Sequence, residues 1–373
     1  MTAKILFKTI YLPTVRNGTK LKLSNNKHTF YLDDEYGIIE NLISQFNGDK
    51  NFDEICSSTN LDKTLVSEIL DFLISNEFIE FINDSDFYRH LSNSRYKSNL
   101  LYYSNYSNPI LSIMDIHNEI GNKCVLLLGL GGASNIAAIL AGMGIGKIVI
   151  VDFDNIDSGN LSRQFLFSEK DIGNQKIKVT KAMINNINSD VDVVAINKKI
   201  SSIASIEEII QAHNIDFIIN GIDNPNLIST RWVNNISVKH SVPFIQGGVS
   251  RNQLLVECFY PNKACYDCFI QNNLDISDEF KHELLTNYGR ESSLQNVSFA
   301  PYISLIAGYI SHYIFEYFLN NLIDSTKDRK SFTNIISTNS IDETYKTYHL
   351  KNDKCKTCSS QSSKLLDNLI EFF

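Results

Sequence analysis

Residues 124–152 constrain the fold of this chain more than any other segment. They contain an apolar run, CVLLL, then a glycine-rich turn, a helix of small residues and a second apolar run, KIVIVD. A continuous apolar run is typical of a parallel strand that helices cover on both faces. The order strand, glycine turn, helix and strand is that of doubly wound sheets that bind nucleotides. The sequence therefore predicts an α/β, Rossmann-like domain with a mostly parallel sheet.

The glycine turn, GLGGASN, predicts a phosphate site but departs from the dinucleotide pattern G-x-G-x-x-G. Gly129, Gly131 and Gly132 permit a tight turn and a close approach of the backbone to a ligand, whereas Ser134 replaces the third glycine. That position serves packing, so we expect Ser134 to shift the helix slightly outward or to place its hydroxyl near the phosphates. Asp152, about twenty residues beyond the turn, has the position of a carboxylate that binds ribose hydroxyls.

The segment after Asp152 favours ATP over NAD. It contains Asn160, Arg163, Gln164 and Lys176. An arginine and a lysine near the turn offer positive charge to a triphosphate, while NAD needs only the helix N-terminus for its pyrophosphate. The chain has no G-x-x-x-x-G-K-[ST] motif, which excludes a P-loop ATPase or kinase. The pattern favours attack at the α-phosphate with release of pyrophosphate.

A second carboxylate follows another predicted strand, DFIIN. Asp223 and Asn224 come at its carboxyl end, on the edge where doubly wound sheets bind ligands. A carboxylate beside a triphosphate is repelled unless a divalent cation lies between them, and Mg²⁺ sites on nucleotides use one or two carboxylates. Asp223 is therefore predicted to bind magnesium. The alternative is an aspartate that caps the turn formed with Asn224 and Pro225.

Two Cys-x-x-Cys pairs predict a structural zinc site. Cys265 and Cys268 form the first pair, and Cys355 and Cys358 the second. Two such pairs far apart in sequence supply the four thiolates of a tetrahedral Zn²⁺ site. The alternative, two separate redox motifs, requires thioredoxin-like surroundings, which the sequence lacks.

Residues 1–90 predict a small winged-helix domain of the α+β class. Strand-like runs precede three short helices, which the apolar spacing places around residues 38–46, 52–56 and 66–73, and residues 78–82 return as a strand. Residues 33–82 contain twelve acidic side chains and two basic ones. Because DNA binding needs basic side chains that replace counterions on phosphates, this composition argues against a DNA-binding domain.

The remaining segments predict a connector at residues 91–120 and the nucleotide-binding domain at residues 121–373. The apolar stretch 301–319 carries His312 and Glu316 and has helical spacing, so we expect a buried helix rather than a membrane span. The net charge of −8 argues against nucleic acid and anionic lipid as partners. The N-terminus lacks the features of a signal peptide, so we expect a cytoplasmic protein.

Residues 33–82 resemble the PqqD-like peptide-recognition domain of enzymes that modify ribosomally made peptides. The resemblance implies that a precursor or leader peptide adds a strand to the small sheet and packs against a helix. The acidic composition suits a basic peptide. The alternative is an accessory domain that binds no peptide.

Four motifs, GLGGASN, VDFDNIDSGNLSRQ, IGNQK and NGIDN, resemble those of the ThiF/MoeB/ubiquitin-activating superfamily. Members adenylate a carboxyl terminus with ATP and Mg²⁺, commonly as homodimers. The resemblance implies that Asp223, Arg163 and Lys176 are catalytic. It also implies a nucleotide site in which Gly132 meets the phosphates, Asp152 the ribose, and Asn160, Arg163 and Lys176 the triphosphate. The sequence pattern and the resemblance together give the expected nucleotide-binding residues, which are Gly129, Gly131, Gly132, Asp152, Asn160, Arg163, Gln164, Lys176 and Asn224.

The superfamily members that transfer sulfur or ubiquitin place a reactive cysteine in the segment that corresponds to residues 269–298. This chain has no cysteine there. We therefore expect the reaction to stop at adenylation, or the phosphoanhydride to serve something other than sulfur transfer.

Over nearly its whole length the chain resembles the MccB-like, peptide-adenylating enzymes of microcin C biosynthesis. The closer match lies in residues 94–111, residues 144–176 and the motif SFAP. It implies ATP-dependent adenylation of the carboxyl-terminal residue of a short, ribosomally made precursor peptide that the N-terminal domain holds. One departure is RYKS, where Ser98 replaces an arginine that reaches the partner subunit's ATP; Lys97 or Arg95 could substitute for it.

The sequence is also compatible with two alternatives. One is a related activating enzyme with another nucleotide or another outcome, such as dehydration of a side chain. The other is a protein without catalytic activity that presents a leader peptide to a separate enzyme. The joint presence of Asp152, Arg163, Lys176 and Asp223 favours an enzyme.

Overall fold

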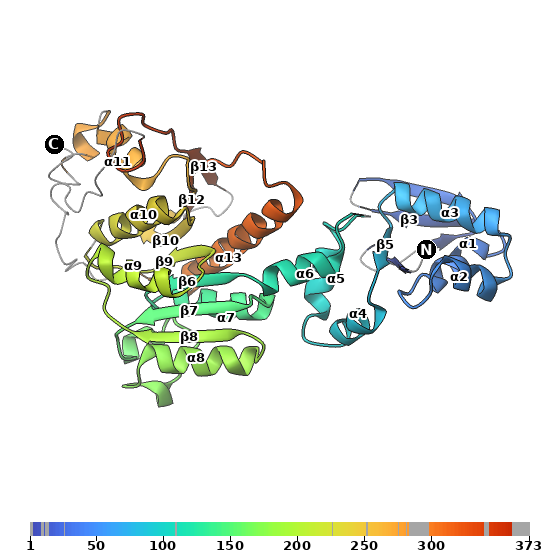
Figure 1. The fold of residues 1–373 in the computed structure, drawn as a ribbon, viewed down its shortest axis with the longest axis horizontal. Helices are drawn as coiled ribbons and strands as arrows, with labels where there is room; N and C mark the ends of the chain where they lie inside the picture. Colours follow the sequence, from blue (N-terminus) through green and yellow to red (C-terminus); the bar gives the residue numbers. More distant parts are fainter. Residues whose placement is uncertain are drawn as a thin grey trace. The chain divides into compact units, whose positions relative to one another are not determined.

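A computed structural model of the chain gives the fold as two compact units, residues 1–119 and residues 120–373 (Figure 1). The structure describes residues 3–8, 11, 15–25, 27–108, 110–225, 227–250, 253–274, 276–280, 282, 298–338 and 343–359.

The first unit contains two small antiparallel sheets and a set of helices. Strand β1 (Lys4–Phe7) pairs with β5 (Ile79–Ile82), and β2 (Val15–Asn17), β3 (Lys20–Ser24) and β4 (Thr29–Asp33) form the second sheet. The three predicted helices are present as α1 (Ile38–Gln45), α2 (Phe52–Thr59) and α3 (Lys63–Ser75). One apolar core joins strands and helices and includes Phe7, Leu21, Leu42, Ile55, Leu73 and Phe78.

The segment predicted as a connector, residues 91–120, contains the helices α5 (Lys97–Tyr103) and α6 (Ile113–Gly121). The helix α4 (Ser85–Ser92) precedes them, and the last two residues of α6 belong to the second unit. Ile113, Ile116 and Ile120 recur at helical spacing and are buried. Both α5 and α6 are short and lie among Ser, Asn and Gly residues, which favour turns, so the sequence pattern did not indicate them.

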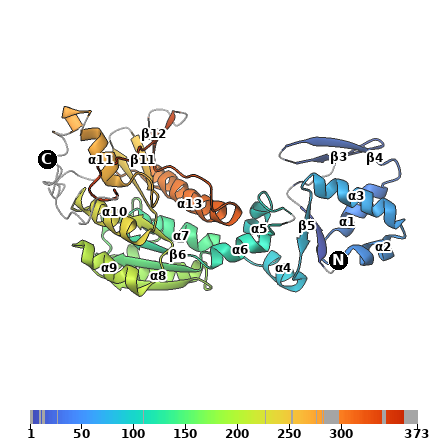
Figure 2. The same cartoon turned by 45° about the horizontal axis from the view of Figure 1, so that its top comes forward.

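The second unit is built on an eight-stranded sheet in the order β13-β12-β11-β10-β9-β6-β7-β8 (Figures 1 and 2). The parallel part comprises β6 (Cys124–Leu128), β7 (Lys147–Asp152), β8 (Asp192–Asn197), β9 (Phe217–Asn220) and β10 (Phe244–Ser250). The strands β11 (Gln253–Phe259), β12 (Phe332–Ser337) and β13 (Thr344–Tyr348) extend it in antiparallel pairing. The predicted α/β fold with a mostly parallel sheet is therefore confirmed.

Helices cover both faces of this sheet. They are α7 (Ala133–Met143), α8 (Lys176–Ile187), α9 (Ile203–Ala212), α10 (Ile228–His240), α11 (Tyr266–Leu274) and α13 (Ala300–Ile323). On β10, Phe244 packs in a core with residues of α10, whereas a Cβ at Gly247 would press against Ile306 of α13. Because side chains alternate along a strand, α10 and α13 lie on opposite faces.

Helix α13 is the buried helix that the sequence predicts. Ile306, Ala307, Ile310 and Ile314 are buried along one side of it. Among the described helices, none is long and apolar enough to cross a membrane.

Candidate functional site

The glycine turn between β6 and α7 lies against the loop that follows β9. Gly129 has a φ angle of 82°, and a Cβ at this position would lie 2.5 Å from the carbonyl oxygen of Gly221. Only glycine adopts this backbone without strain at so close an approach. The turn therefore brings the ends of β6 and β9 together at the carboxyl edge of the sheet.

We expect Gly129→Ala to lower the free energy of unfolding by about 1–3 kcal/mol, because the alanine meets both a strained φ and a backbone oxygen. The measurement is urea denaturation. Gly142→Ala in α7 is the matched control, since a Cβ there meets no atom within 4 Å. Equal losses in the two variants would contradict the role of Gly129.

Ser134 stabilises the turn itself. Its side chain is fully buried, and its hydroxyl donates to the carbonyl oxygen of Gly131 at 2.9 Å. Gly132 lies against α13, where its Cβ would be 3.3 Å from Ile303, and it does not line the cavity described next. The phosphate contact expected of Gly132 stays a prediction.

A cavity of about 510 Å³ opens at this edge of the sheet, a size typical of small-ligand sites. Most of the residues predicted to bind the nucleotide line it together with the predicted magnesium ligand. These are Gly129, Gly131, Asp152, Asn160, Arg163, Gln164, Lys176, Asp223 and Asn224.

Asp152, at the end of β7, holds two segments of the cavity wall. Its carboxylate accepts a hydrogen bond from the backbone N–H of Leu130 at 2.6 Å and another from that of Asp154 at 2.7 Å. Each carboxylate oxygen has a second lone pair, so the group can also accept from ribose hydroxyls.

The two basic side chains predicted to bind the phosphates, Lys176 and Arg163, reach the cavity from different segments. Lys176, at the start of α8, is buried and forms an ion pair with Asp154 at 3.0 Å. Arg163 donates one hydrogen bond to the carbonyl oxygen of Gly159 at 2.7 Å. Asn135 on α7 fixes this segment, because its amide donates to the carbonyl oxygen of Arg163 at 3.0 Å. Sequence reasoning missed this role of Asn135.

Two polar side chains complete this wall. Asn160 closes a capping box with Asp157, whose N–H donates to the Asn160 side-chain oxygen at 3.1 Å. Gln164 is buried, and its side-chain oxygen has no hydrogen-bond partner among the described residues. A buried amide oxygen without a partner is costly, so a donor from a bound ligand would stabilise it.

Asp223 faces the same cavity from the loop after β9. Desolvation by the surrounding protein raises the pKa of its carboxyl, while the charges of Lys176 and Arg163 lower it. The residue nevertheless remains exposed in the cavity. A carboxylate with Asp152 and Asp154 nearby is a donor set that suits Mg²⁺, so the residues fit the predicted ion.

Two further lysines, which the sequence did not indicate, also line the cavity. Lys198 and Lys199 follow β8, and Lys199 lies 5.3 Å from the ring centre of Phe153. Lys198 pairs with Glu208 of α9. The signal that could have found them is their position at the carboxyl end of a parallel strand.

The four cysteines of the two Cys-x-x-Cys pairs come together in the second unit. All four Sγ atoms lie within 4.8 Å of one another, with separations of 3.8 Å (Cys265 to Cys268), 3.7 Å (Cys265 to Cys355) and 3.3 Å (Cys268 to Cys358). Tetrahedral Zn²⁺ with Zn–S bonds of about 2.3 Å holds its sulfurs about 3.8 Å apart. The arrangement is compatible with zinc.

A buried ion pair ties this cluster to α10. Arg231 donates to both carboxylate oxygens of Asp267 at 2.9 and 3.2 Å, and both side chains are buried. In the sequence, Asp267 lies between Cys265 and Cys268, and Thr357 lies between Cys355 and Cys358. The hydroxyl of Thr357 also donates a hydrogen bond to the Asp267 carboxylate. The two cysteine pairs are therefore held together by side chains as well as by any metal.

The other three cysteines are buried. Burial raises the pKa of Cys56, and it raises the pKa of Cys124 and Cys258 to about 12. Such thiols are protonated and unreactive near neutral pH. Much of the segment expected to lack a reactive cysteine, residues 275, 281 and 283–297, lies outside the described residues.

Ser98, which departs from the arginine of the RYxR motif, is exposed at the start of α5 beside exposed Lys97. Both belong to the first unit. Whether either reaches a partner subunit's nucleotide stays a prediction.

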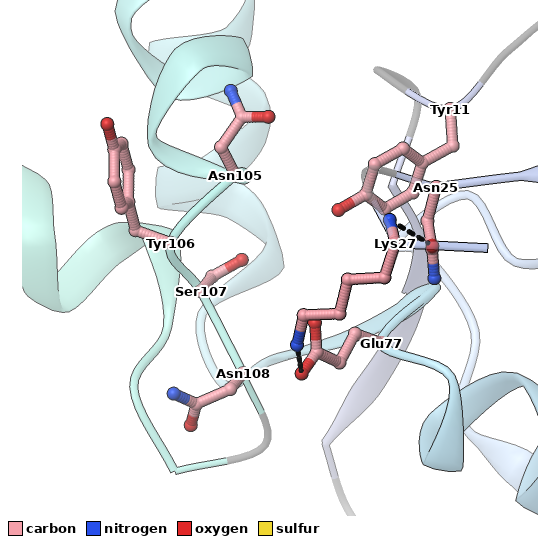
Figure 3. Close-up of a pocket in the computed structure, with 8 residues that line it drawn as sticks. All are labelled: Tyr11, Asn25, Lys27, Glu77, Asn105, Tyr106, Ser107 and Asn108. Atoms are coloured by element: carbon pink, nitrogen blue, oxygen red, sulfur yellow. Dashed lines mark hydrogen bonds and ion pairs between the residues drawn. The ribbon is translucent and has the colours of Figure 1, made fainter.

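The first unit has a cavity of its own, of about 220 Å³ (Figure 3). Lys27 and Glu77 form an ion pair of 2.8 Å in it, and Tyr11, Asn25 and residues 105–108 complete the lining. Among the described residues that line it, Lys27 and Glu77 are the charged ones, unlike the several cations and carboxylates of the larger cavity.

Comparison with known proteins identifies relatives of this arrangement. The model of the ThiF family matches residues 104–359. The sulfur carrier protein ThiS adenylyltransferase of Escherichia coli K12 is 28% identical over 177 residues, which cover 46% of this chain and 68% of that protein. The chain spans 53% or less of seven other curated relatives, among them ubiquitin-like modifier-activating enzyme 5 of Drosophila erecta.

Solved structures resemble almost the entire chain. A crystal structure of E. coli MccB with AMPCPP and MccA is 25% identical, has a TM-score of 0.68 and covers 95% of this chain and 99% of that one. A structure of the microcin C7 biosynthetic enzyme MccB with N-formylated MccA has the same TM-score and coverage at 24% identity. The fold similarity therefore includes most of the first unit.

Proposed function

Because this chain belongs to the ThiF family and is an adenylyltransferase of that type, we propose that it uses ATP to adenylate the carboxyl-terminal residue of a short, ribosomally made precursor peptide, as in microcin C-like antibiotic biosynthesis. The observation that carries the proposal is the cavity in which Asp152, Arg163, Lys176 and Asp223 converge. The similarity in fold to MccB, which binds AMPCPP and MccA, supports the choice of substrates.

In the proposed reaction a carboxylate oxygen of the peptide attacks the α-phosphorus of ATP. The bond from that phosphorus to the bridging oxygen breaks, and pyrophosphate leaves. Arg163 and Lys176 stabilise the negative charge that develops on the phosphates, since fixed cations in a partly enclosed site act strongly on a transition state. Asp152 holds the ribose, and the glycine turn lets the backbone approach the phosphates.

Asp223 would hold Mg²⁺ in this reaction. The ion, when bound, neutralises phosphate charge and makes the α-phosphorus more electrophilic. Without it the carboxylate of Asp223 would repel the triphosphate. A homodimer with a shared cleft is part of the proposal, and light scattering at about micromolar concentration measures it.

We propose that the first unit holds the peptide at the free edge of β4. This strand is the last in its sheet, and its residues Phe30 and Leu32 are only half-buried against the core. Phe30 packs edge-on against Phe72 of α3, with ring centres 5.2 Å apart, and Ile69 of α3 is also half-buried. An edge strand beside a partly covered apolar strip is the surface that β-augmentation requires.

We expect Ile69→Ser to raise the dissociation constant of the peptide at least about tenfold and to leave that of ATP unchanged, because it removes apolar area that the added strand would cover. Asp71→Ser, an exposed change on the same helix, is the control. Fluorescence anisotropy with a labelled peptide measures both. A peptide affinity equal to that of the wild type in Ile69→Ser would contradict binding at this strip.

The experiment that tests the proposed activity is ATP–pyrophosphate exchange with the peptides encoded by short reading frames beside the gene. Exchange requires a reversible attack on the α-phosphate, so a protein that only presents a leader peptide shows none. Mass spectrometry of the product then separates adenylation from transfer of another nucleotide or from dehydration.

A further inference from the structure

A continuous row of hydrogen-bonded side chains crosses the sheet of the second unit. Asn220, Gln246, Glu257 and Thr333 are paired in register on the neighbouring strands β9 to β12. Asn220 donates to Gln246 at 2.8 Å, Gln246 donates to Glu257 at 2.7 Å, and Thr333 donates to Glu257 at 3.2 Å. His349 lies 3.0 Å from the Thr333 hydroxyl and ends the row.

The donors in this row converge on Glu257. Burial lowers the pKa of His349 to about 4, so its ring is neutral near pH 7 and can donate its N–H to Thr333. The hydroxyl proton of Thr333 then points to Glu257, as does an amide proton of Gln246. A carboxylate has about four acceptor sites, and these bonds use two of them. Burial raises the pKa of Glu257, whereas the hydrogen bonds from Gln246 and Thr333 lower it. Among the described residues, these two bonds leave acceptor sites on Glu257 for a ligand.

Glu257 and Thr333 also line a groove of about 920 Å³. One side of the groove is the face of β11, β12 and β13, with Leu255 and Ile335, and the other side is α11, with Phe269. The groove combines apolar walls with a carboxylate that has unused acceptor sites. This combination suits a peptide segment, whose N–H groups can donate to Glu257 and whose apolar side chains can contact Leu255 and Phe269.

The row connects this groove to the nucleotide cavity. Asn220 directly precedes Gly221–Asn224, which line that cavity, and its side-chain oxygen accepts from the N–H of Ile222 at 3.3 Å. Glu257 lies two strands from Asn220, a distance of about 10 Å. Beside this row, Gly248 lies opposite Leu255 on the neighbouring strand, and a Cβ on Gly248 would meet no atom of the described residues within 4 Å, which leaves the surface there open.

We propose that the last three residues of the peptide substrate lie across this surface, and that Glu257 selects them by accepting a hydrogen bond from a side-chain or backbone N–H. The inference rests on the proposed function. Three extended residues span about 10 Å, which is the distance from Glu257 to the end of β9. A group with unused acceptor sites favours an amide, which can donate a hydrogen bond, over an ionised acidic side chain, whose oxygens only accept.

The test uses the peptide that supports ATP–pyrophosphate exchange, with each of its last three residues replaced in turn by Asn and by Asp. At one position we expect the wild type to prefer Asn over Asp by at least about tenfold in kcat/KM, mainly through KM, as for loss of a hydrogen bond that leaves a buried partner unsatisfied. In Glu257→Gln this ratio should fall to within about threefold. Glu169→Gln is the control, because Glu169 is exposed and does not line the groove, and this variant should keep the wild-type ratio.

A second variant tests whether the peptide crosses this surface, and it leaves the row of hydrogen-bonded side chains unchanged. Gly248→Leu fills the open surface and has no left-handed φ to strain, so we expect a rise of at least about tenfold in peptide KM with the ATP dissociation constant unchanged. Gly142→Leu is the control. Equal Asn-to-Asp ratios in the wild type and Glu257→Gln, or an unchanged peptide KM in Gly248→Leu, would overturn this inference while exchange still upheld the proposed function. Absence of exchange with every peptide would overturn both.

Discussion

Asp223→Ala is expected to lower ATP–pyrophosphate exchange at least about 100-fold and to leave peptide binding intact. The expected loss is that for removal of a group that stabilises the transition state through charge. Asp223 faces the cavity from the loop after β9, near Lys176 and Arg163, and is the proposed Mg²⁺ ligand there. Asp223→Asn keeps the side-chain volume and should lose as much, because the amide carries no charge to bind the ion.

The control for Asp223 is Asp71→Ala, an exposed aspartate on α3. Exchange is measured over a range of Mg²⁺ concentrations, and peptide binding by anisotropy. Wild-type exchange in Asp223→Ala would remove this residue from the magnesium role. Loss of peptide binding together with exchange would indicate that the substitution disturbs the fold of the loop instead.

Removal of zinc is expected to have the second large effect. We expect about one zinc ion per chain by elemental analysis, and we expect Cys268→Ser to lose it and to lower the Tm by at least about 10 °C, since structural zinc contributes many kcal/mol to folding. Cys268 lies in a small buried cluster with Ala264, Cys265 and Cys355, against which the partly buried Cys358 packs, so a serine without a hydrogen-bond partner at position 268 is also costly.

The control for the zinc site is Cys56→Ser, which removes a buried thiol of the first unit and should leave the zinc content unchanged. A strong chelator should lower the Tm of the wild type and not that of an already metal-free Cys268→Ser protein. A folded, zinc-free wild type with an unchanged Tm would contradict the site, and the Arg231–Asp267 pair would then hold the two cysteine pairs together without a metal.

The parts of the fold that the sequence predicts well are those with a strong local pattern. The apolar run of β6, the glycine turn and the apolar run of β7 form one continuous pattern. The spacing of the two Cys-x-x-Cys pairs predicted that Cys265 and Cys355 lie in one site, and the structure places them in one cluster. The helices α5 and α6 were missed because they are short, seven and nine residues, and are flanked by Ser and Asn residues that favour turns.

The parts of the site that the sequence does not predict depend on tertiary register. Lys198 joins the cavity only because β8 lies beside β7 in the sheet. Gln246, Glu257 and Thr333 are distant in sequence and become neighbours through the pairing of β10, β11 and β12. No spacing rule links such residues, since their proximity follows from strand order.

The most direct test of the proposed activity is ATP–pyrophosphate exchange with the neighbouring peptides, each made with a free carboxyl terminus and with an amidated one. We expect labelled pyrophosphate to enter ATP only when Mg²⁺ and one of the free-acid peptides are present, and the amidated form of that peptide to support none. Exchange that is absent with every peptide, or equal with the amidated form, would contradict activation of a peptide's carboxyl end.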